Sequence, residues 1–285
     1  MAAAMQNLEI SSSFVTLGSM AKVTGYSLAC FVLALWASGV QAGDYEQRLV
    51  TDLVKKPVAG ETVWLQVGGK KTLALFIGDA DATGQRAAIL LHSMGTHADW
   101  PEIISPLRSA LPRRGWSTLS LQLPVLSPGT PLSEYGGTLT EASARIRSGV
   151  SYLLDRGFSE IVIIGYSFGA TAAVNYLAKN PSRVRALIGI SMQPWPFLSP
   201  GFDLLGHLAQ LKLPVLDIYG SRDYAEVHRA ADDRRLSGKR NGNHYYEQHV
   251  INGADHYYTE QEVELSDTIA NWLDKLPVIT ESMAK

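Results

Sequence analysis

The stretch Ile163-Ile164-Gly165-Tyr166-Ser167-Phe168-Gly169-Ala170 (IIGYSFGA) passes from β-branched residues directly into small ones, with a serine at the junction. Residues 160–166 are apolar almost throughout, which predicts a buried strand, and residues 168–181 have the pattern of a helix. A G-x-S-x-G sequence between a strand and a helix predicts a nucleophile elbow, a strained turn that exposes the serine hydroxyl. Gly165 and Gly169 supply the small neighbours that such a turn requires.

Strands and helices alternate along the chain around this turn. Residues 61–67 and 71–78 flank Gly68-Gly69-Lys70-Lys71 and predict an antiparallel hairpin. Further strands are predicted at 86–93, 116–124, 160–167, 184–192, 214–220 and 244–252. Helices are predicted at 101–115, 138–157 (opened by a capping box, Thr138 to Glu141), 168–181, 202–211, 224–236 and 262–276. The expected fold class is therefore α/β, a mostly parallel doubly wound sheet with an N-terminal antiparallel hairpin.

Length and composition limit the classes of protein that fit. The chain has 285 residues, of which 46% are hydrophobic, and residues 43–285 are expected to form a single domain. The net charge of -2 and the lack of a basic block argue against a nucleic-acid partner. No C-x-x-C or H-E-x-x-H spacing occurs, so neither a metal site nor a cofactor is expected.

The N-terminus has the pattern of a targeting segment. Lys22 precedes an apolar run at 25–40, and the run ends in the small-residue cleavage pattern Val40-Gln41-Ala42. Residues 1–42 are therefore predicted to be a signal peptide, with Met20 as an alternative start and a buried N-terminal helix as the alternative structure. The run is short for a membrane span, so we expect a periplasmic or secreted protein without a membrane anchor after cleavage.

A serine hydroxyl needs a base to take its proton, and the base needs an acid to orient it. His256 lies in a loop after the last predicted strand, at the same sheet edge as Ser167, and is the expected base. For the acid, Asp223 follows the penultimate strand and is favoured over Asp217, which lies within that strand. Structural roles are expected for four further histidines, His207, His228, His244 and His249.

The end of the strand predicted at 86–93 and the first residue of the loop after it are expected to supply the second donor of an oxyanion hole. The first donor would be the N–H of Phe168, and the second that of Met94 or of Ser93. His92 is interpreted as a residue that shapes this loop, with a catalytic His92 as the alternative.

The proline- and aromatic-rich segment SMQPWPFLSPGF spans residues 191–202 and overlaps a candidate lid at residues 192–212. We interpret this segment as a small lid over the site, with a loop that has an apolar underside as the alternative.

Four stretches resemble the α/β-hydrolase superfamily: residues 90–124, IIGYSFGA, GSRD (220–223) and GADH (253–256). Within it, the chain resembles a Gram-negative bacterial family of secreted α/β-hydrolase-like proteins of undefined function, and residues 90–124 carry that part of the resemblance. The resemblance implies hydrolase chemistry but no particular substrate. The chain departs from the superfamily in one position, because it has His92-Ser93 where members usually have His-Gly.

The sequence thus favours a serine hydrolase, and among these a carboxylesterase with a small-molecule acyl substrate. Ser167 would attack the acyl carbonyl, His256 would take its proton, and Asp223 would orient the imidazole. The N–H groups of Phe168 and Met94 would hold the oxyanion. The alternative is a non-catalytic protein of the same fold that binds a ligand or a cell-envelope partner.

Overall fold

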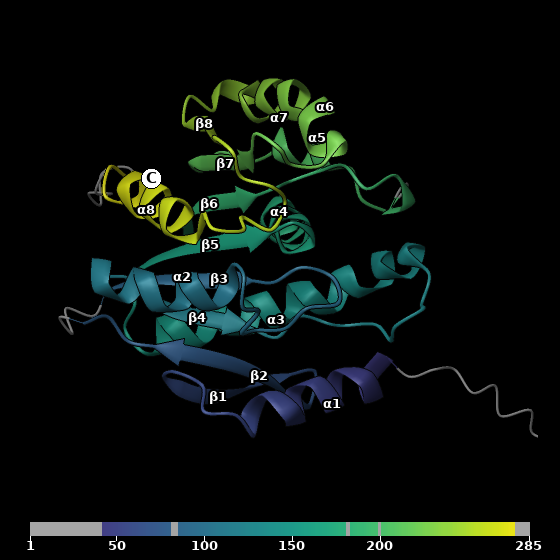
Figure 1. The fold of residues 1–285 in the computed structure, drawn as a ribbon, viewed down its shortest axis with the longest axis vertical. Coiled ribbons are helices and arrows are strands. Elements are labelled where there is room, and N and C mark those ends of the chain that lie inside the picture. The colour runs from purple at the N-terminus through teal and green to yellow at the C-terminus, as the bar shows by residue number, and fades with distance from the viewer. Residues whose placement is uncertain (1–41, 81–84, 181–182, 199–200, 277–285) are drawn as a thin grey trace, which may run out of the picture. The chain divides into compact units, whose positions relative to one another are not determined.

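The computed structural model describes residues 42–80, 85–180, 183–198 and 201–276. Within these residues, an 8-stranded sheet has the strand order β1-β2-β4-β3-β5-β6-β7-β8 (Figure 1). The strands are β1 (Glu61–Val67), β2 (Lys70–Ile77), β3 (Arg86–Leu91), β4 (Ser117–Leu121), β5 (Glu160–Tyr166), β6 (Val184–Ile190), β7 (Val215–Gly220) and β8 (Tyr246–Ile251).

The strand pairing confirms the predicted fold class. β1 and β2 form the antiparallel hairpin, and β2 also pairs antiparallel with β4. From β4 onward all neighbouring strands are parallel. The carboxyl ends of β3, β5, β6 and β7 therefore meet at one edge of the sheet, which is where such sheets carry their binding sites.

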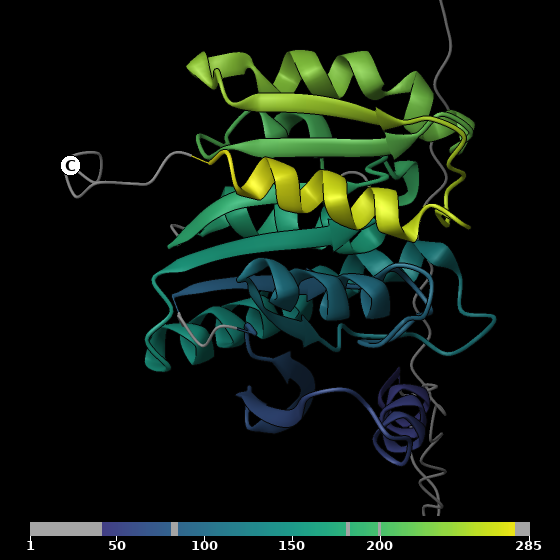
Figure 2. The ribbon, with the colours of Figure 1, turned by 60° about the vertical axis from the view of Figure 1, so that its left-hand side comes forward.

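Helices cover both faces of the sheet, as Figures 1 and 2 show. They are α1 (Ala42–Val54), α2 (Ile104–Ala110), α3 (Tyr135–Asp155), α4 (Phe168–Lys179), α5 (Leu204–Leu208), α6 (Ala225–Arg229), α7 (Ala231–Gly238) and α8 (Glu262–Leu273). Residues of α3, α4 and α5 share one hydrophobic cluster with one face of the sheet, and residues of α2 and α8 share another with the opposite face.

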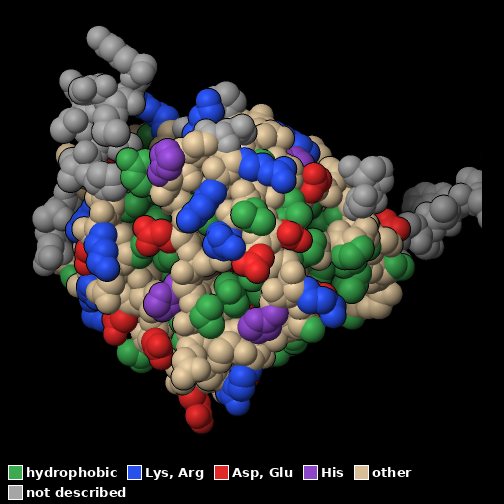
Figure 3. All heavy atoms as spheres, turned by 90° about the horizontal axis from the view of Figure 1, so that it is seen from above, with side chains coloured by type: hydrophobic (Ala, Val, Ile, Leu, Met, Phe, Trp, Pro, Cys, Tyr) green, Lys and Arg blue, Asp and Glu red, His purple; other side chains and the backbone are tan. Residues whose placement is uncertain are grey.

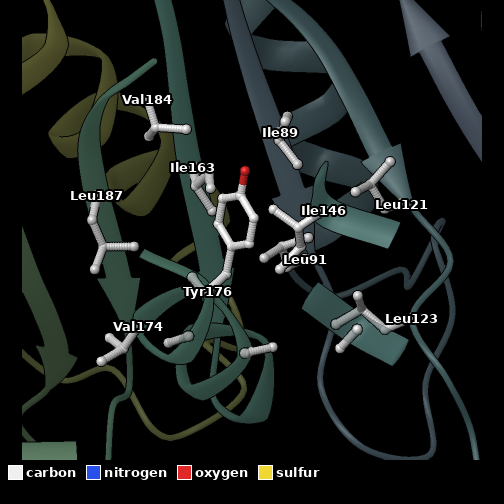
Figure 4. Packing of buried hydrophobic residues seen from close by; sticks show 14 of the residues in the cluster. Ile89, Leu91, Leu121, Leu123, Ile146, Ile163, Val174, Tyr176, Val184 and Leu187 are labelled. Carbon is white, nitrogen blue, oxygen red and sulfur yellow. The ribbon is translucent and has the colours of Figure 1, made fainter. Parts of the chain in front are cut away.

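Alternation within the strands sends neighbouring residues to opposite faces. In β5, Ile163 belongs to the first cluster and Ile164 to the second. Figure 4 shows the ring of Tyr176, from α4, beside Ile163 of the sheet and Ile146 of α3. All of these side chains are buried, and each contributes roughly 1.5–3 kcal/mol on transfer from water. The strands that carry the site are thus fixed from both sides.

Helix α1 is not expected from the sequence pattern. Its Val50 and Leu53 pack against Leu73 and Leu75 of β2 in a third, smaller cluster. Two polar contacts also fix the helix, because Glu46 pairs with Arg145 at 2.6 Å and accepts the Val125 N–H at 3.2 Å. The apolar stripe is too narrow to predict a helix, and its partners are distant in the chain.

The predicted capping box at Thr138 is wrong, because α3 begins three residues earlier, at Tyr135. The Thr138 hydroxyl donates back to the Tyr135 carbonyl at 2.7 Å instead of capping a free N–H. A 3-10 turn, η2 (Leu132–Glu134), leads into the helix and removes the need for a side-chain cap.

Three other predicted helices differ from expectation, and the one predicted at 202–211 is reduced to α5. The helix predicted at 101–115 is α2 followed by the 3-10 turn η1 (Leu111–Arg114), because Pro112 cannot donate a backbone hydrogen bond there. The helix predicted at 224–236 is divided at Ala230 into α6 and α7.

The signal peptide predicted at 1–42 lies outside the described residues except for Ala42, which begins α1. Among the described residues, no helix has both the length and the apolar character needed to span a membrane.

Candidate active site

Ser167 occupies the turn between β5 and α4 with an unusual backbone conformation, φ 53° and ψ -112°. Such a conformation costs on the order of 1–3 kcal/mol, so the surrounding structure must hold it in place. The Ser167 N–H donates to the Ile190 carbonyl of β6 at 2.8 Å, and the Ser167 carbonyl accepts from Ala170 at 3.1 Å. The turn is therefore anchored to the sheet on one side and to the helix on the other.

The two flanking glycines are required by close backbone contacts. A Cβ at Gly169 would lie 2.2 Å from the Leu91 carbonyl oxygen and 2.7 Å from that of His92. A Cβ at Gly165 would lie 2.6 Å from the backbone of Ala170. Only glycine lets α4 start this close to the end of β3.

Ser167 is 2% exposed, whereas the sequence predicts a hydroxyl exposed at the top of the turn. The difference arises because three loops converge on this edge. Ser93, after β3, accepts the Phe168 N–H on its hydroxyl, Ile190 ends β6, and His256, after β8, accepts a hydrogen bond from the Tyr166 hydroxyl on its carbonyl.

Asp223 and His256 lie together at the same edge. The Asp223 Oδ1 is 2.7 Å from the His256 Nδ1, and both side chains are buried. Asp223 follows β7 by a short turn, in which its own N–H donates to the Gly220 carbonyl at 3.1 Å. His256 follows β8 in the loop that leads to α8. The His256 Nδ1 is thus paired with a carboxylate, which leaves Nε2 for proton transfer. In this structure Ser167 and His256 share no direct hydrogen bond.

The second oxygen of Asp223 is also held. The Ser191 hydroxyl donates to Oδ2 at 2.5 Å, and the Tyr258 hydroxyl lies 3.2 Å from that of Ser191. Burial raises the pKa of Asp223, but hydrogen bonds from His256 and Ser191 outweigh it and lower the pKa below its ordinary value. Asp223 is therefore a carboxylate at neutral pH.

Three tyrosines surround the His256 ring, and each is next in sequence to one of the predicted residues. Tyr224 stacks on the ring at 4.0 Å between centroids, Tyr257 meets it edge-on at 5.6 Å, and Tyr166 lies tilted at 5.4 Å. The hydroxyls of Tyr224 and Tyr257 are 2.9 Å apart. These contacts fix the plane of the imidazole.

Sequence reasoning missed Ser191 and these tyrosines. Ser191 directly follows β6, the strand next to β5, and has a positive φ of 54°. Its position at the carboxyl end of β6 is the one sequence signal that could have identified it. Tyrosines beside Ser167, Asp223 and His256 carry no such signal, because only the folded loops bring their rings onto the imidazole.

Asp217 is placed differently. It is fully buried and forms an ion pair with Arg234, with 2.9 Å between Nε and Oδ2. Its Oδ2 also accepts hydrogen bonds from the Tyr246 hydroxyl and the Gln248 amide, both at 2.8 Å. These partners tie β7 to β8 and α7, so Asp217 is a structural carboxylate.

His92 is buried within the loop that follows β3. Its Nε2 accepts the Leu123 N–H at 2.9 Å, so the ring proton is on Nδ1, which donates to the Ser93 carbonyl at 2.8 Å. Burial lowers the pKa of His92 to about 3, and the hydrogen bond to Ser93 opposes this only in part. His92 is therefore neutral and shapes the loop, as the first of the two sequence interpretations has it.

The Ser93 carbonyl accepts two further hydrogen bonds, from the Thr96 hydroxyl at 2.9 Å and the Thr96 N–H at 3.4 Å. In a trans peptide the following N–H points opposite to the carbonyl. The orientation of the Met94 N–H is therefore fixed, directed away from the His92 network. The Phe168 N–H, at the start of α4, lies 3.4 Å from the Ser93 hydroxyl oxygen.

The four histidines for which structural roles are expected do not contact Asp223. His207 stacks on Phe202, His228 packs edge-on against Tyr219, and His244 and His249 are exposed.

The segment predicted as a lid is attached to the protein at Trp195. Its indole N–H donates to the Thr171 hydroxyl of α4 at 3.0 Å, and its ring lies 5.3 Å from that of Phe197. Both rings are half-buried against the first hydrophobic cluster. The described part of the segment thus has an apolar underside.

A hollow of about 660 Å³ lies between the loop 126–131 and the start of α3. It is not lined by Ser167, Asp223 or His256. Tyr135, next to Glu134 of its wall, meets the Phe168 ring edge-on at 5.3 Å. Tyr135 thus connects the wall of the hollow to the residue that follows Ser167, and the hollow does not contain the polar groups themselves. Among the residues that the structure describes, no cluster of His, Cys, Asp or Glu could hold a metal ion.

Solved structures share this fold. The chain superposes on Est1E from Butyrivibrio proteoclasticus with a TM-score of 0.62 and 15% identity, covering 75% of this chain and 98% of that one. The esterase Pf2001 from Pyrococcus furiosus gives a TM-score of 0.60 at 19% identity, covering 79% and 93%. XC6422 from Xanthomonas campestris, described as an α/β serine hydrolase without a lid, gives 0.60 at 14%, covering 79% and 98%. At these identities the likeness shows the α/β-hydrolase fold.

A search of curated protein sequences found no match to this chain. A family model does match, over residues 41–142 and 133–275, and these two segments include every predicted site residue. The chain therefore belongs to the family described as "Protein of unknown function (DUF3530)", and its fold is that of the α/β hydrolases.

Proposed function

We propose that this protein is a serine hydrolase that cleaves carboxylic esters with Ser167, His256 and Asp223. One observation carries the proposal: a serine with φ 53° lies at the same sheet edge as a buried aspartate–histidine pair with a 2.7 Å hydrogen bond. A carboxylate that orients Nδ1, together with a serine on a strained turn, is the arrangement that acyl transfer requires.

In the proposed reaction, the Ser167 oxygen bonds to the acyl carbon while His256 Nε2 takes the hydroxyl proton. The carbonyl electron pair moves onto oxygen, where the N–H groups of Phe168 and Met94 stabilise it. The oxyanion then collapses, the ester C–O bond breaks, and His256 returns the proton to the leaving alcohol. Water repeats the sequence and releases the acid. Asp223 remains ionised throughout, which its lowered pKa supports.

The preference for esters rests on the structural neighbours. Two of them are esterases, and Est1E has been solved with ferulic acid bound. The substrate would be a small acyl ester, and the hollow beside α3 offers room for one part of it.

Two measurements on the purified protein test the proposal. A fluorophosphonate probe should label Ser167, as peptide mapping would show, and p-nitrophenyl esters from acetate to laurate, with methyl ferulate added, should be hydrolysed. Ser167→Ala should abolish labelling and lower kcat by about 10⁶-fold, while its free energy of unfolding stays within about 1 kcal/mol.

Ser151→Ala on the exposed face of α3 is the matched control and should leave both readouts unchanged. A folded Ser167→Ala protein with more than a few per cent of the activity would refute the nucleophile. A wild-type protein that neither labels nor hydrolyses any ester would favour a non-catalytic binding protein of this fold.

A further inference from the structure

The Ser93 hydroxyl lies at the start of α4 and accepts the Phe168 N–H, with 3.4 Å between the two heavy atoms. In the proposed reaction this same N–H stabilises the oxyanion. Ser93 therefore places a hydroxyl next to the position where negative charge develops.

We propose that the Ser93 hydroxyl is a third oxyanion donor, beside the N–H groups of Phe168 and Met94. The inference rests on the proposed function and adds a catalytic side chain to it. In the free protein the hydroxyl is an acceptor. When the oxyanion takes over the Phe168 N–H, the hydroxyl rotates about its Cβ–Oγ bond and donates its own hydrogen.

The distances permit this exchange. An oxyanion is held about 2.9 Å from an N–H nitrogen and about 2.7 Å from a hydroxyl oxygen. These two lengths form an ordinary triangle with the 3.4 Å between the Phe168 nitrogen and the Ser93 oxygen. One oxygen atom can therefore accept from both groups without movement of the backbone.

The position of the hydroxyl is fixed before substrate arrives. Hydrogen bonds from His92 and Thr96 hold the Ser93 carbonyl, and the carbonyls of Leu91 and His92 lie against Gly169. The loop is thus clamped on the first turn of α4. Because the loop is already in place, only the O–H bond has to rotate when the oxyanion forms, and a small reorganisation favours strong oxyanion stabilisation.

The backbone does not require glycine at this position. Among the described residues, positive φ angles outside glycine occur at Ser167, Ser191, Tyr258 and Glu260, and Ser93 is not one of them. A side chain at 93 is therefore accommodated without strain, and its oxygen is available for chemistry.

The hydroxyl performs no covalent step. It donates a hydrogen bond to the oxyanion that forms when Ser167 adds to the carbonyl, and it keeps its proton when the oxyanion collapses. The proton balance of the reaction stays with His256 alone.

The test compares Ser93→Ala, Ser93→Gly and Ser93→Thr with the wild type. Ser117→Ala is the matched control, because the Ser117 hydroxyl also accepts a backbone N–H, from Asp79 at 3.0 Å, but lies at the amino end of β4. For each variant we would measure kcat and KM on a p-nitrophenyl ester, the inhibition constant of a trifluoromethyl ketone, and the melting temperature. The ketone forms a tetrahedral adduct with an oxyanion.

We expect Ser93→Ala and Ser93→Gly to lower kcat by about 10²-fold, with KM changed less than about threefold. Affinity for the trifluoromethyl ketone should fall by the same factor as kcat/KM. Ser93→Thr, which keeps the hydroxyl, should retain most of the activity, and Ser117→Ala should match the wild type.

Three outcomes would overturn the inference. A kcat that is not lowered in Ser93→Ala would mean that the hydroxyl does not stabilise the oxyanion, and a higher kcat would mean that it competes with the oxyanion for the Phe168 N–H. A lower kcat with unchanged ketone affinity would assign Ser93 a structural role. A wild-type protein that neither labels nor hydrolyses esters would refute the proposed function, and with it this inference. An active wild type whose Ser93 variants keep full activity would refute the inference alone.

Discussion

Asp217 and Asp223 are two buried carboxylates six positions apart in sequence, one within β7 and one just after it. The partner of Asp217 is Arg234, a permanent cation that is itself fully buried. The partner of Asp223 is His256, an imidazole of the kind that can act as a general base. The first pair can only hold the fold together, whereas the second can take part in proton transfer. The chemistry of the partner, not the burial of the acid, separates the two roles.

Of the variants that test this comparison, Asp223→Asn should have the largest effect on kcat. Asp223→Asn should lower kcat by about 10⁴-fold while the melting temperature changes little, because the amide can no longer fix the Nδ1–H tautomer of His256. Steady-state kinetics and thermal melting on the same preparation measure this. If Asp217→Asn has that kinetic effect and Asp223→Asn does not, the assignment of the two acids is reversed.

Asp217→Asn should show the opposite profile. It leaves the Arg234 charge buried without a counter-charge, so the free energy of unfolding should fall by about 3–5 kcal/mol. The fraction that remains folded should keep its kcat. Denaturant unfolding at a temperature where the variant is still folded gives the first number, and activity per folded molecule gives the second. A stable variant that has lost activity would contradict the comparison.

His92 is a third buried ionisable group, and its hydrogen-bond partners are neutral backbone and side-chain groups. Its folded-state pKa of about 3 lies below the ordinary value of 6.5, so between these values only the unfolded chain binds the proton. Stability should therefore fall as pH falls from about 6.5 towards 3, by up to roughly 1.4 kcal/mol per pH unit from this group. His92→Gln should be less stable at pH 7 but have a flatter pH dependence. Equal slopes in both proteins would show that His92 does not cause the acid sensitivity.

Removing the Ser191 hydroxyl, which donates a hydrogen bond to Asp223, should have a smaller effect on kcat than removing the Asp223 carboxylate. The loss of this hydroxyl leaves Asp223 Oδ2 without the 2.5 Å donor, which should lower kcat by about tenfold. Ser191→Ala and Ser191→Gly should show the same decrease in kcat. Because Ser191 has a φ of 54°, the glycine variant should be the more stable of the two by roughly 1 kcal/mol. Different activities in the two variants would point to backbone strain rather than to the hydroxyl.

The smallest effect is expected from the segment at Trp195 and Phe197, which lies away from both aspartates. Truncation of both residues to Ala should raise KM for long acyl chains by about threefold and leave acetate unchanged. The chain-length series of p-nitrophenyl esters measures this. Equal changes along the series would make the segment a packed loop, in line with its half-buried rings.

Figure 3 shows one face of the molecule, on which acidic and basic side chains are interspersed with hydrophobic ones and histidines. This mixture corresponds to the net charge of -2. No single sign of charge dominates that face.

Much of the arrangement was accessible from the sequence because it depends on local patterns. The hairpin at Gly68-Gly69, the strand that ends at Tyr166 and the helix that starts at Phe168 each follow from a few adjacent residues. The order of Ser167, Asp223 and His256 along alternating strands also predicts that they share one edge. Prediction failed at Thr138 because a 3-10 turn starts the helix earlier, and it failed in α1 because the deciding contacts were with distant segments.

By itself, the sequence determined the alternation of strands and helices, the elbow at Ser167 and the preference for Asp223 over Asp217, since these follow from periodicity, glycine positions and strand ends. Only the tertiary structure decided that Ser191 holds Asp223, that three tyrosines surround His256 and that the Ser93 hydroxyl meets the Phe168 N–H. Apart from the neighbours His256 and Tyr257, those contacts join residues between 32 and 90 positions apart in sequence. No local pattern encodes such contacts, because they depend on how loops from separate strands pack against one another.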